Sequence, residues 1–469
     1  MPRKKSYITA TDQFCGAGGS SSGATEAGVE VKLAMNHWKL AIETHNTNFP
    51  KVDHDCADMS AVDPRRYPTT DILITSPECT NHSLAKGKKR RLYEKDLFGN
   101  ILIDPAEERS RATMWDVPRF AEYHDYNIIA VENVVDAGKW VMWDSWLHAM
   151  HSLGYEHEVV YFNSMFAHPT PQSRDRLYTI FWKKGNKKPD LEFRPKAHCP
   201  RCLKDVESIQ TWKKHLKWGR YKKQYFYRCS SCHQEVTPYY YAAFNAIDFS
   251  IPSTKIGDRP ENNKLVPKTI QRIQFGLDAY GRDPLILTGK YTTGIGSRVR
   301  NALSQTIPTQ TGEAAHGIVF PWIIDTAHTQ ANGKYVYPSK NPMPTQTTRQ
   351  TLGVVSAFLS KAYGGNAKPQ NMGVGLHQPT GTITTQDHHA LIEAKAFLER
   401  ASLVQYLDSL KVEDLYYRML QPKEIGKAMA FRENHIVLGN SKEQTKQYGN
   451  AVTPPVMKML MQRCIASLG

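Results

Sequence analysis

The sequence lacks any apolar run long enough to cross a bilayer. Its basic opening stretch, MPRKKSYITATDQF, also lacks the apolar segment of a signal peptide. Without a secretory signal, the eight cysteines are not expected to form a disulfide framework. These absences predict a cytoplasmic protein that has no membrane partner.

The sequence has fewer acidic than basic side chains. There are 45 Asp and Glu against 60 Lys and Arg, which gives a formal charge of +15. Residues 183–232 alone hold 15 Lys and Arg against 4 Asp and Glu, a local net of +11. A solvated surface would explain charge of this kind, but its concentration in one stretch favours a polyanionic partner such as nucleic acid.

Half of the cysteines fall in two CxxC units, 26 residues apart. Two such pairs supply four soft thiolates for a tetrahedral Zn²⁺. We therefore predict a zinc-ribbon-like insert over residues 195–236, with chance thiols or a redox pair as the alternatives. Whether the zinc is purely structural, or the basic insert also contacts DNA phosphates, stays open. The predicted ligands are Cys199, Cys202, Cys229 and Cys232.

Apolar strand-like runs alternate with helical stretches over the first 180 or so residues. This alternation predicts an α/β doubly wound sheet, in which ligands bind beyond the carboxyl ends of the strands. The glycines of FCGAGG permit a tight turn and close approach to a ligand, although a plain structural turn would look the same. After a first strand that leads into this turn, strands are expected at 31–38, 70–77, 127–134 and 177–182.

Two reactive side chains stand where predicted strands end. Cys79 follows the run DILITSP, and Glu132 closes the run NIIAVE. Each alone has an ordinary explanation, a buried small hydrophobe for the thiol and a surface carboxylate for the acid. Together at one edge of a sheet they suit covalent catalysis beside a general acid.

The order of short motifs adds a family to this interpretation. The chain resembles the DNA (cytosine-5) methyltransferases, which use S-adenosylmethionine. The resemblance implies a Rossmann-like S-adenosylmethionine-binding sheet built from residues 1–185 and 416–469. It also implies a β-rich target-recognition domain over residues 186–415. The motifs that carry it, in the family's order, are DQFCGAGG, SPECTNHS, ENV, QSRDR, YYRMLQPKEIGKAMAF and YGNAVTPPV.

This resemblance assigns roles to four catalytic residues. Cys79, as a thiolate, would add to C6 of a cytosine flipped out of the duplex and so activate C5 for methylation. Glu132 would hold N3 and N4 of the base and favour protonation at N3. Arg176 would bind the cytosine O2, with Arg174 supporting the site or a phosphate. The basic stretch 82–100 resembles the mobile loop that closes over substrate, a solvated loop being the alternative.

The resemblance also implies a cofactor site. Trp38 would lie against the adenine, and Asp58 would read its amino group. The chain departs from the family at His37, where an acid usually grips the ribose hydroxyls, and at Glu78, where proline usually precedes the cysteine. Glu78 is expected to point away from the thiolate. The full predicted set is Phe14, Gly16, Gly18, His37, Trp38, Asp58, Asn450 and Val452.

An internal repeat occupies residues 300–393. Three segments share a Thr-Gln centre followed by an apolar strand-like end, and Thr309, Thr345 and Thr385 correspond. Three such units predict a repeated β-rich layer whose polar turns can reach base edges or phosphates. Ordinary β-turn chemistry is the alternative.

Together these features predict a monomeric enzyme that methylates C5 of cytosine in double-stranded DNA. It would work at the nucleoid, in the cytoplasm of a prokaryote or a phage-infected host. One alternative is a transfer-RNA cytosine-5 methyltransferase of the same fold. Those relatives are compact and carry a Cys-Phe-Thr signature after the carboxylate, where this chain has ENVVDAGKW. The other alternative is a non-catalytic DNA-binding relative, against which the intact Cys79, Glu132 and Arg176 argue.

Overall fold

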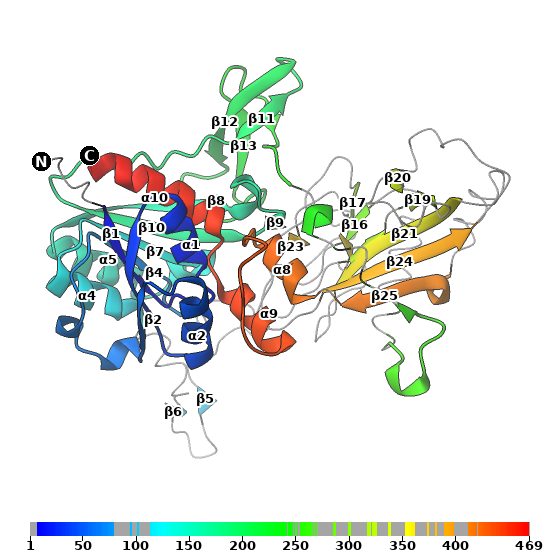
Figure 1. Cartoon of the computed structure of the whole chain (residues 1–469). Helices are drawn as coiled ribbons and strands as arrows, with labels where there is room; N and C mark the ends of the chain where they lie inside the picture. Colours follow the sequence, from blue (N-terminus) through cyan, green and yellow to red (C-terminus); the bar gives the residue numbers. More distant parts are fainter. Residues whose placement is uncertain are drawn as a thin grey trace, which may run out of the picture.

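The computed structural model describes most of the chain (Figure 1). The described residues are 7–78, 94–95, 101–102, 113–241 and 421–468, with strands and short segments between 243 and 419. Cys79 and nearly all of the predicted loop 82–100 lie outside them. No helix within this part of the chain combines the length and apolar character needed to span a membrane.

A seven-stranded sheet forms the first body, in the order β3-β2-β1-β4-β7-β10-β8. Its strands run parallel except β10, which is antiparallel to both β7 and β8. This parallel-rich sheet confirms the predicted α/β fold class. Its strands are β1 (Thr9–Gln13), β2 (Glu30–Asn36), β3 (Asp53–Cys56), β4 (Ile72–Thr75), β7 (Ile128–Val134), β8 (Tyr155–Asn163) and β10 (Asp175–Lys183).

Both faces of this sheet are covered by apolar packing. Ile72 and Ile74 of β4 belong to one core cluster, with residues of α1 and α10, whereas Leu73 belongs to the other, with residues of α4 and α5. A strand buried on both faces needs a continuous apolar run, which the sequence ILIT supplies. The helices are α1 (Gly19–Glu26), α2 (Lys39–Asn48), α4 (Asp116–His124) and α5 (Trp143–Ser152).

The last fifty residues return to the first sheet as α8 (Pro422–Ala428), α9 (Ser441–Asn450) and α10 (Pro454–Leu468). Here α10 packs directly on α1, and the two backbones are very close. A Cβ at Gly23 would stand 2.3 Å from the Pro454 carbonyl oxygen, so only glycine fits. The Lys458 ammonium also lies 3.1 Å from the Glu26 carboxylate.

A small antiparallel sheet forms the insert, in the order β11-β12-β13-β14, and rises from the β8 side of the first body (Figure 1). Its strands are β11 (Lys196–Cys199), β12 (Lys204–Trp212), β13 (Tyr225–Cys229) and β14 (Glu235–Val236). They fall inside the predicted range 195–236. Tyr225 and Tyr227 are buried at its base.

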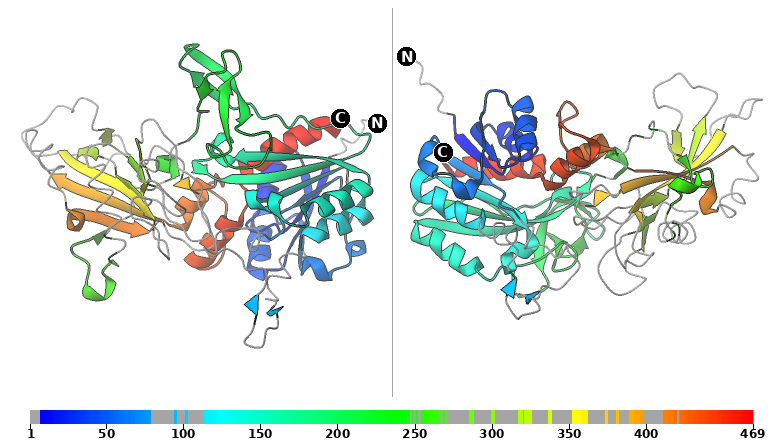
Figure 2. Two further views of the ribbon diagram at one scale, coloured as in Figure 1. Left: turned by 180° about the vertical axis from the view of Figure 1, so that it is seen from behind. Right: turned by 90° about the horizontal axis from the view of Figure 1, so that it is seen from below.

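The third body is a second sheet, beside the first, with α8 and α9 between them (Figures 1 and 2). The apolar ends of the three sequence repeats lie in β21 and β24 of this sheet and in β18 (Gly317–Val319) of a smaller sheet. The corresponding Thr309, Thr345 and Thr385 lie outside the described residues. The β-rich second part of the predicted fold is therefore present. Its strands are β15 (Thr254–Lys255), β25 (Leu415–Met419), β24 (His389–Phe397), β21 (Leu352–Lys361), β19 (Pro321–Asp325), β20 (Val336–Pro338) and β22 (Gly373–Val374).

Shorter elements complete the described chain. Strand β23 (Thr380–Gly381) pairs in parallel with β9 (Gln172–Ser173), and so brings the repeat region to the QSRDR motif. A small sheet joins β17 (Val299–Asn301), β16 (Leu285–Leu287) and β18 (Gly317–Val319), and β5 (Glu94–Lys95) pairs with β6 (Ile101–Leu102). The 3₁₀ helices are η1 (Met59–Ala61), η2 (Pro64–Arg66), η4 (Thr113–Trp115), η5 (Val135–Lys139), η6 (Ser164–Phe166), η7 (Ala243–Ala246), η8 (Glu261–Asn263) and η10 (Val412–Asp414).

Candidate active site

A buried carboxylate and a buried guanidinium meet where β7 and β10 lie side by side. Glu132 is in register with Tyr178 of β10, so Arg176, two residues earlier, projects from the same face. Arg176 Nε lies 2.9 Å from Glu132 Oε1, and the two side chains are 11% and 9% exposed. Within the described chain this oxygen accepts no well-aligned hydrogen bond. The carboxylate is therefore charge-compensated but keeps capacity to bind a ligand.

The charge of Glu132 also affects the pKa of Tyr178, its neighbour on β10. Burial raises the pKa of Tyr178 above its usual value, and the nearby Glu132 carboxylate raises it further. Tyr178 therefore stays a neutral phenol at neutral pH. The charges that act on Tyr178 are those of Glu132, Arg176 and Arg174.

The chain leading to Cys79 is fixed beside Glu132. Asn133 Nδ2 donates a hydrogen bond of 3.3 Å to the carbonyl oxygen of Pro77. The amide of Ser76 donates to the carbonyl oxygen of Gln13 at 3.3 Å, which extends the pairing of β4 with β1. Cys79 itself lies outside the described residues, but its strand ends at the same edge of the sheet as Glu132.

Arg174 contacts a different partner from Arg176. Its guanidinium is buried and donates to the carbonyl oxygens of Gly449 and Ala451, at 3.1 Å and 3.2 Å. These residues belong to the YGNAVTPPV motif, 275 and 277 residues away in sequence. Arg174 thus joins the start of β10 to the C-terminal segment, and its role in the reaction stays a prediction.

The turn between β1 and α1 is open on one side. The φ angles of Phe14, Gly16 and Gly18 are 57°, 50° and 80°, in the left-handed region. Among the described residues, a Cβ at Gly16 would meet nothing closer than the Phe14 carbonyl oxygen at 3.8 Å. A ligand can therefore approach this backbone closely, and the residues fit the methionine end of S-adenosylmethionine.

Asp12 holds the start of α1 onto the end of β1. The hydroxyls of Ser20 and Ser21 both donate to its Oδ2 at 2.6 Å. Its buried Oδ1 accepts no hydrogen bond from any described residue. Burial raises the pKa of Asp12 to about 6, although the serine hydrogen bonds oppose this shift.

A histidine pair extends this network towards the surface. His45 Nε2 lies 2.9 Å from Ser21 Oγ, and His45 Nδ1 lies 2.8 Å from His54 Nε2. Since Ser21 donates its proton to Asp12, its oxygen accepts from His45 Nε2–H. His45 Nδ1 is then the acceptor and His54 Nε2–H the donor. Burial lowers the pKa of His45 to about 3, so this ring is neutral.

The two departures from the family pattern contact each other. His37 Nδ1 lies 3.5 Å from Glu78 Oε1, with the side chains 56% and 38% exposed. Beside them, the Lys446 ammonium stands 4.5 Å from the ring centroid of Trp38 and covers one face of the indole. The expectation for Glu78 concerned its direction from Cys79, which lies outside the described residues. The structure adds that its carboxylate belongs to the neighbourhood of His37.

The remaining predicted cofactor residues lie at two places. Asp58 is exposed and caps η1 by accepting from the Ser60 amide at 3.1 Å. Val452 is buried against the start of α1, where a Cβ at Gly19 would stand 2.0 Å from its carbonyl oxygen. Asn450 is exposed at the end of α9.

The four CxxC thiols gather in the insert, with all Sγ atoms within 4.8 Å of one another. The Sγ atoms of Cys199 and Cys232 are 3.5 Å apart, and those of Cys202 and Cys229 are 3.9 Å apart. Tetrahedral zinc with Zn–S bonds of about 2.3 Å needs sulfurs about 3.8 Å apart. The cluster therefore fits a zinc ion.

Comparison with known proteins decides the family. Residues 8–466 match the model of the C-5 cytosine-specific DNA methylase family. The chain belongs to this family. The predicted resemblance is thereby confirmed for the C-5 cytosine-specific DNA methylases.

Relatives match over shorter segments. The chain is 33% identical to the Type II methyltransferase M.HgiDI of Herpetosiphon aurantiacus over 99 residues, which are 20% of this chain and 32% of that relative. It is 35% identical to M.HgiGI of the same organism over 83 residues, 17% of this chain and 64% of that one. Both matches span less than two thirds of the relative. The crystal structure of S. pombe Dnmt2 methyltransferase aligns with a TM-score of 0.47 and 11% identity, covering 99% of this chain and 100% of that one.

Sequence reasoning missed several residues that this C-5 methylase chain uses to build the site. Asp12 lies inside the DQFCGAGG motif, and Asn133 lies inside ENV, so both stood next to predicted residues. Their partners, Ser20 and Pro77, become neighbours only in the folded chain. His45 had no local signal, because it is a single histidine in α2 whose partners Ser21 and His54 come from other elements.

Proposed function

We propose that the chain is a DNA (cytosine-5) methyltransferase that acts on double-stranded DNA with S-adenosylmethionine as methyl donor. One observation carries this proposal, namely the buried pair Glu132–Arg176 beside the segment that leads to Cys79, in a chain that matches the family over residues 8–466. The names of the bacterial relatives, Type II methyltransferases, support it.

The cofactor, when bound, supplies the methyl group. The open turn takes its methionine end, Trp38 takes the adenine on the indole face that Lys446 leaves clear, and Asp58 accepts from the adenine amino group. His37 and Glu78 stand on the ribose side. The proposed cofactor-binding residues are Phe14, Gly16, Gly18, His37, Trp38, Asp58, Asn450 and Val452.

The chain's own side chains prepare the base. The ionised Glu132 carboxylate accepts from the N4 amino group and stabilises a proton that N3 takes up from solvent, while Arg176 donates to O2. The Cys79 thiolate then adds to C6, which makes C5 nucleophilic, and it leaves again after the C5 proton is lost. Because a stacked cytosine cannot reach these groups, the base is flipped out of the duplex. Arg174 supports the site through the C-terminal motif.

DNA as the partner is supported by charge. The stretch 183–232 carries a net of +11, and Lys213, Lys214 and Lys217 are exposed on the turn between β12 and β13. Lysines of this kind neutralise backbone phosphates without reading sequence. We propose residues 1–185 with 416–469 as the catalytic domain and 186–415 as the target-recognition domain, including the insert 195–236 and the repeats 300–393. We further propose a monomer that works in the cytoplasm at the nucleoid.

We also propose that Cys199, Cys202, Cys229 and Cys232 hold a structural Zn²⁺. The sulfur spacing supports this, and amides donate to two of the sulfurs, from Cys202 to Cys199 Sγ and from Ser231 to Cys229 Sγ. Metal analysis of the purified protein tests it. We expect one equivalent of zinc, lost in Cys199→Ser. The proposal would be contradicted if the purified protein contained no zinc, the four cluster thiols reacted freely with a thiol reagent, and Cys199→Ser unfolded at the same midpoint as the wild type.

The proposed reaction is tested with labelled S-adenosylmethionine and three nucleic acids, namely unmethylated duplex DNA, a 5-fluorocytosine duplex and transfer RNA. We expect label in the duplex and a covalent protein adduct with the fluorinated one, because the C5 fluorine blocks release of Cys79. Label in transfer RNA alone would favour the RNA alternative. Duplex binding without label or adduct would favour the non-catalytic relative.

A further inference from the structure

Within the insert, the turn between β12 and β13 packs against η5. This 3₁₀ helix directly follows β7, the strand that carries Glu132. The Trp218 indole Nε1 donates to the Val135 carbonyl oxygen at 2.9 Å. The Arg220 guanidinium Nη2 lies 2.6 Å from Asp136 Oδ2, in a pair whose side chains are only 24% and 13% exposed. The insert therefore holds the chain three and four residues beyond Glu132.

The same turn also holds the strand that carries Arg176. The amide of Tyr221 donates to Asp175 Oδ1 at 3.0 Å, in a buried contact. Asp175 is the first residue of β10 and directly precedes Arg176. One short segment, Trp218 to Tyr221, thus contacts both arms of the Glu132–Arg176 pair.

Aromatic packing makes this contact rigid. A Cβ at Gly138 of η5 would stand 2.7 Å from Tyr161 Oη and 3.3 Å from Trp218 Cδ1, so η5 is packed between β8 and the insert. The Phe166 ring lies edge-on to Tyr221 with centroids 4.9 Å apart. Side chains packed in this way cannot shift without disturbing their neighbours.

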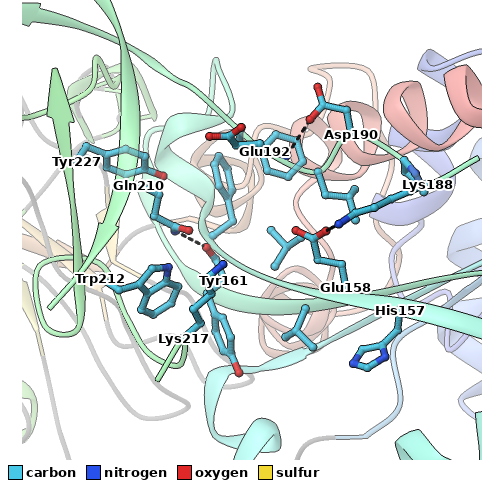
Figure 3. A pocket seen from close by; sticks show the side chains of 16 residues that line it. His157, Glu158, Tyr161, Lys188, Asp190, Glu192, Gln210, Trp212, Lys217 and Tyr227 are labelled. Atoms are coloured by element: carbon cyan, nitrogen blue, oxygen red, sulfur yellow. Dashed lines mark hydrogen bonds and ion pairs between the residues drawn. The ribbon is translucent and has the colours of Figure 1, made fainter. Parts of the chain in front are cut away.

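The insert is joined to the first sheet at a second place. Gln210 Nε2 of β12 donates to the Tyr161 carbonyl oxygen of β8 at 2.9 Å, and both residues line a groove of about 860 Å³ (Figure 3). Tyr161 pairs with Leu177, the residue after Arg176. The insert is thus attached to β8 and to both strands of the candidate site.

We infer that the insert positions the active site, with Trp218, Arg220 and Tyr221 as positioning residues for Glu132 and Arg176. This inference rests on the proposed function and gives the insert a task besides contact with DNA. A carboxylate and a guanidinium must stand correctly relative to one base, and a displacement of about 1 Å can cost about 100-fold in rate. The contacts of Trp218, Arg220 and Tyr221 prevent such displacement by holding Val135, Asp136 and Asp175 in place.

The test uses the full-length protein and two variants. Trp218→Phe keeps an aromatic ring but removes the N–H donor together with the five-membered part of the indole, and Arg220→Gln removes the charge facing Asp136. Two readouts are compared, the steady-state constants for methyl transfer and amide hydrogen exchange over residues 128–140 and 173–183. We expect kcat to fall by about tenfold or more in each variant, with KM for S-adenosylmethionine unchanged. Exchange over 133–139 should rise while the unfolding midpoint stays close to that of the wild type.

Two controls separate positioning from general effects. Arg65→Gln removes the same charge from an exposed ion pair of equal length, 2.6 Å to Asp63, and should change neither kcat nor exchange. Because Arg220 and Asp136 act through one contact, Arg220→Gln combined with Asp136→Asn should be no worse than the poorer single variant.

The exchange measurement keeps this inference separate from the proposed reaction. If the wild type transfers no methyl group to any nucleic acid, the proposed function fails, and exchange alone decides whether the insert holds η5. Unchanged exchange over 133–139 overturns the inference whatever the activity. Raised exchange with wild-type kcat in an active enzyme overturns it as well.

Discussion

Glu132 and Arg176 illustrate how single side chains combine stability with chemistry at this site. Each charge is nearly buried, and each would be costly alone, but at 2.9 Å they compensate one another. The same burial keeps water away from the carboxylate that we propose binds the base. The fold thus tolerates the buried charge of Glu132 because Arg176 is held beside it on the neighbouring strand β10.

Replacing Arg176 by Gln should therefore harm both stability and activity. The change leaves Glu132 buried without a compensating charge, and we expect a loss of about 3 kcal/mol in the free energy of unfolding. Urea unfolding measures the loss, with Arg176→Lys as the control that keeps the charge. A loss below about 1 kcal/mol would mean that water already solvates the carboxylate.

His37 and Glu78, the two departures from the family pattern, lie next to each other, and we expect each to be tolerated because of the other. Changing His37→Asp alone restores the family's acid but places two carboxylates where an imidazole and a carboxylate now lie 3.5 Å apart. We expect this variant to bind S-adenosylmethionine about fivefold more weakly, since like charges repel and solvent screens them only in part. Adding Glu78→Pro should restore binding. Calorimetry measures both, and equal affinity of the single and double variants would contradict the pairing.

Asp12 predicts a dependence of stability on pH. Its folded pKa is about 6 against an ordinary 3.8, so the folded protein holds this proton more tightly than the unfolded chain. Its contribution to stability is therefore full below pH 3.8 and is lost as pH rises to about 6, by about 3 kcal/mol. Asp12→Asn should lack this loss, because an amide keeps an acceptor for the serines. Parallel unfolding curves of the two proteins across pH 4–7 would refute the assignment.

Among helices and strands, the sequence predicted the middle of the sheet better than its edges. Strands β4 and β7 are buried on both faces and begin with apolar runs, ILIT and IIAV, whereas the buried β1 was found from the glycine-rich turn that follows it. The two strands that escaped prediction, β3 with DHDC and β8 with YEHEVVYFN, are the outermost in the strand order. Solvent reaches an edge strand, so polar residues are tolerated there. Such a strand therefore lacks the continuous apolar run by which the central strands were recognised.

The candidate site divides in the same way. Short sequence motifs were enough to place Glu132 near the end of β7, Arg176 at the start of β10 and Trp38 just after β2, because each motif is a continuous segment next to its strand. The contacts that hold them, such as Asn133 to Pro77 and Arg220 to Asp136, join residues 56 and 84 positions apart. No local pattern contains such a pair, and no residue at either end is unusual by itself.

The close packing of α1 on α10 gives a prediction for these helices. Gly23→Ala would place a methyl group 2.3 Å from the Pro454 carbonyl oxygen and force the helices apart. We expect a loss of about 3 kcal/mol in the free energy of unfolding. Thr25→Ala, an exposed position on the same helix, should cost nothing. Equal stability of the two variants would show that the C-terminal helix can move away freely.

For the chain as a whole, segments from three parts of the sequence meet at one edge of the first sheet. The first sheet carries the reacting groups, the insert contacts the ends of its strands, and β23 from the repeat region pairs with β9 in the QSRDR motif. The C-terminal helices α8 and α9 lie between the first and second sheets (Figure 1). This arrangement explains why motifs at opposite ends of the sequence are needed together.

The central claim is that a single sulfur makes C5 of cytosine reactive. Nucleoside mass spectrometry on unmethylated duplex DNA, incubated with S-adenosylmethionine and either wild-type protein or Cys79→Ala, tests it most directly. The account predicts 5-methylcytosine with the wild type and none with the variant, although the variant still binds the duplex. Formation of 5-methylcytosine by Cys79→Ala at the wild-type rate would contradict it.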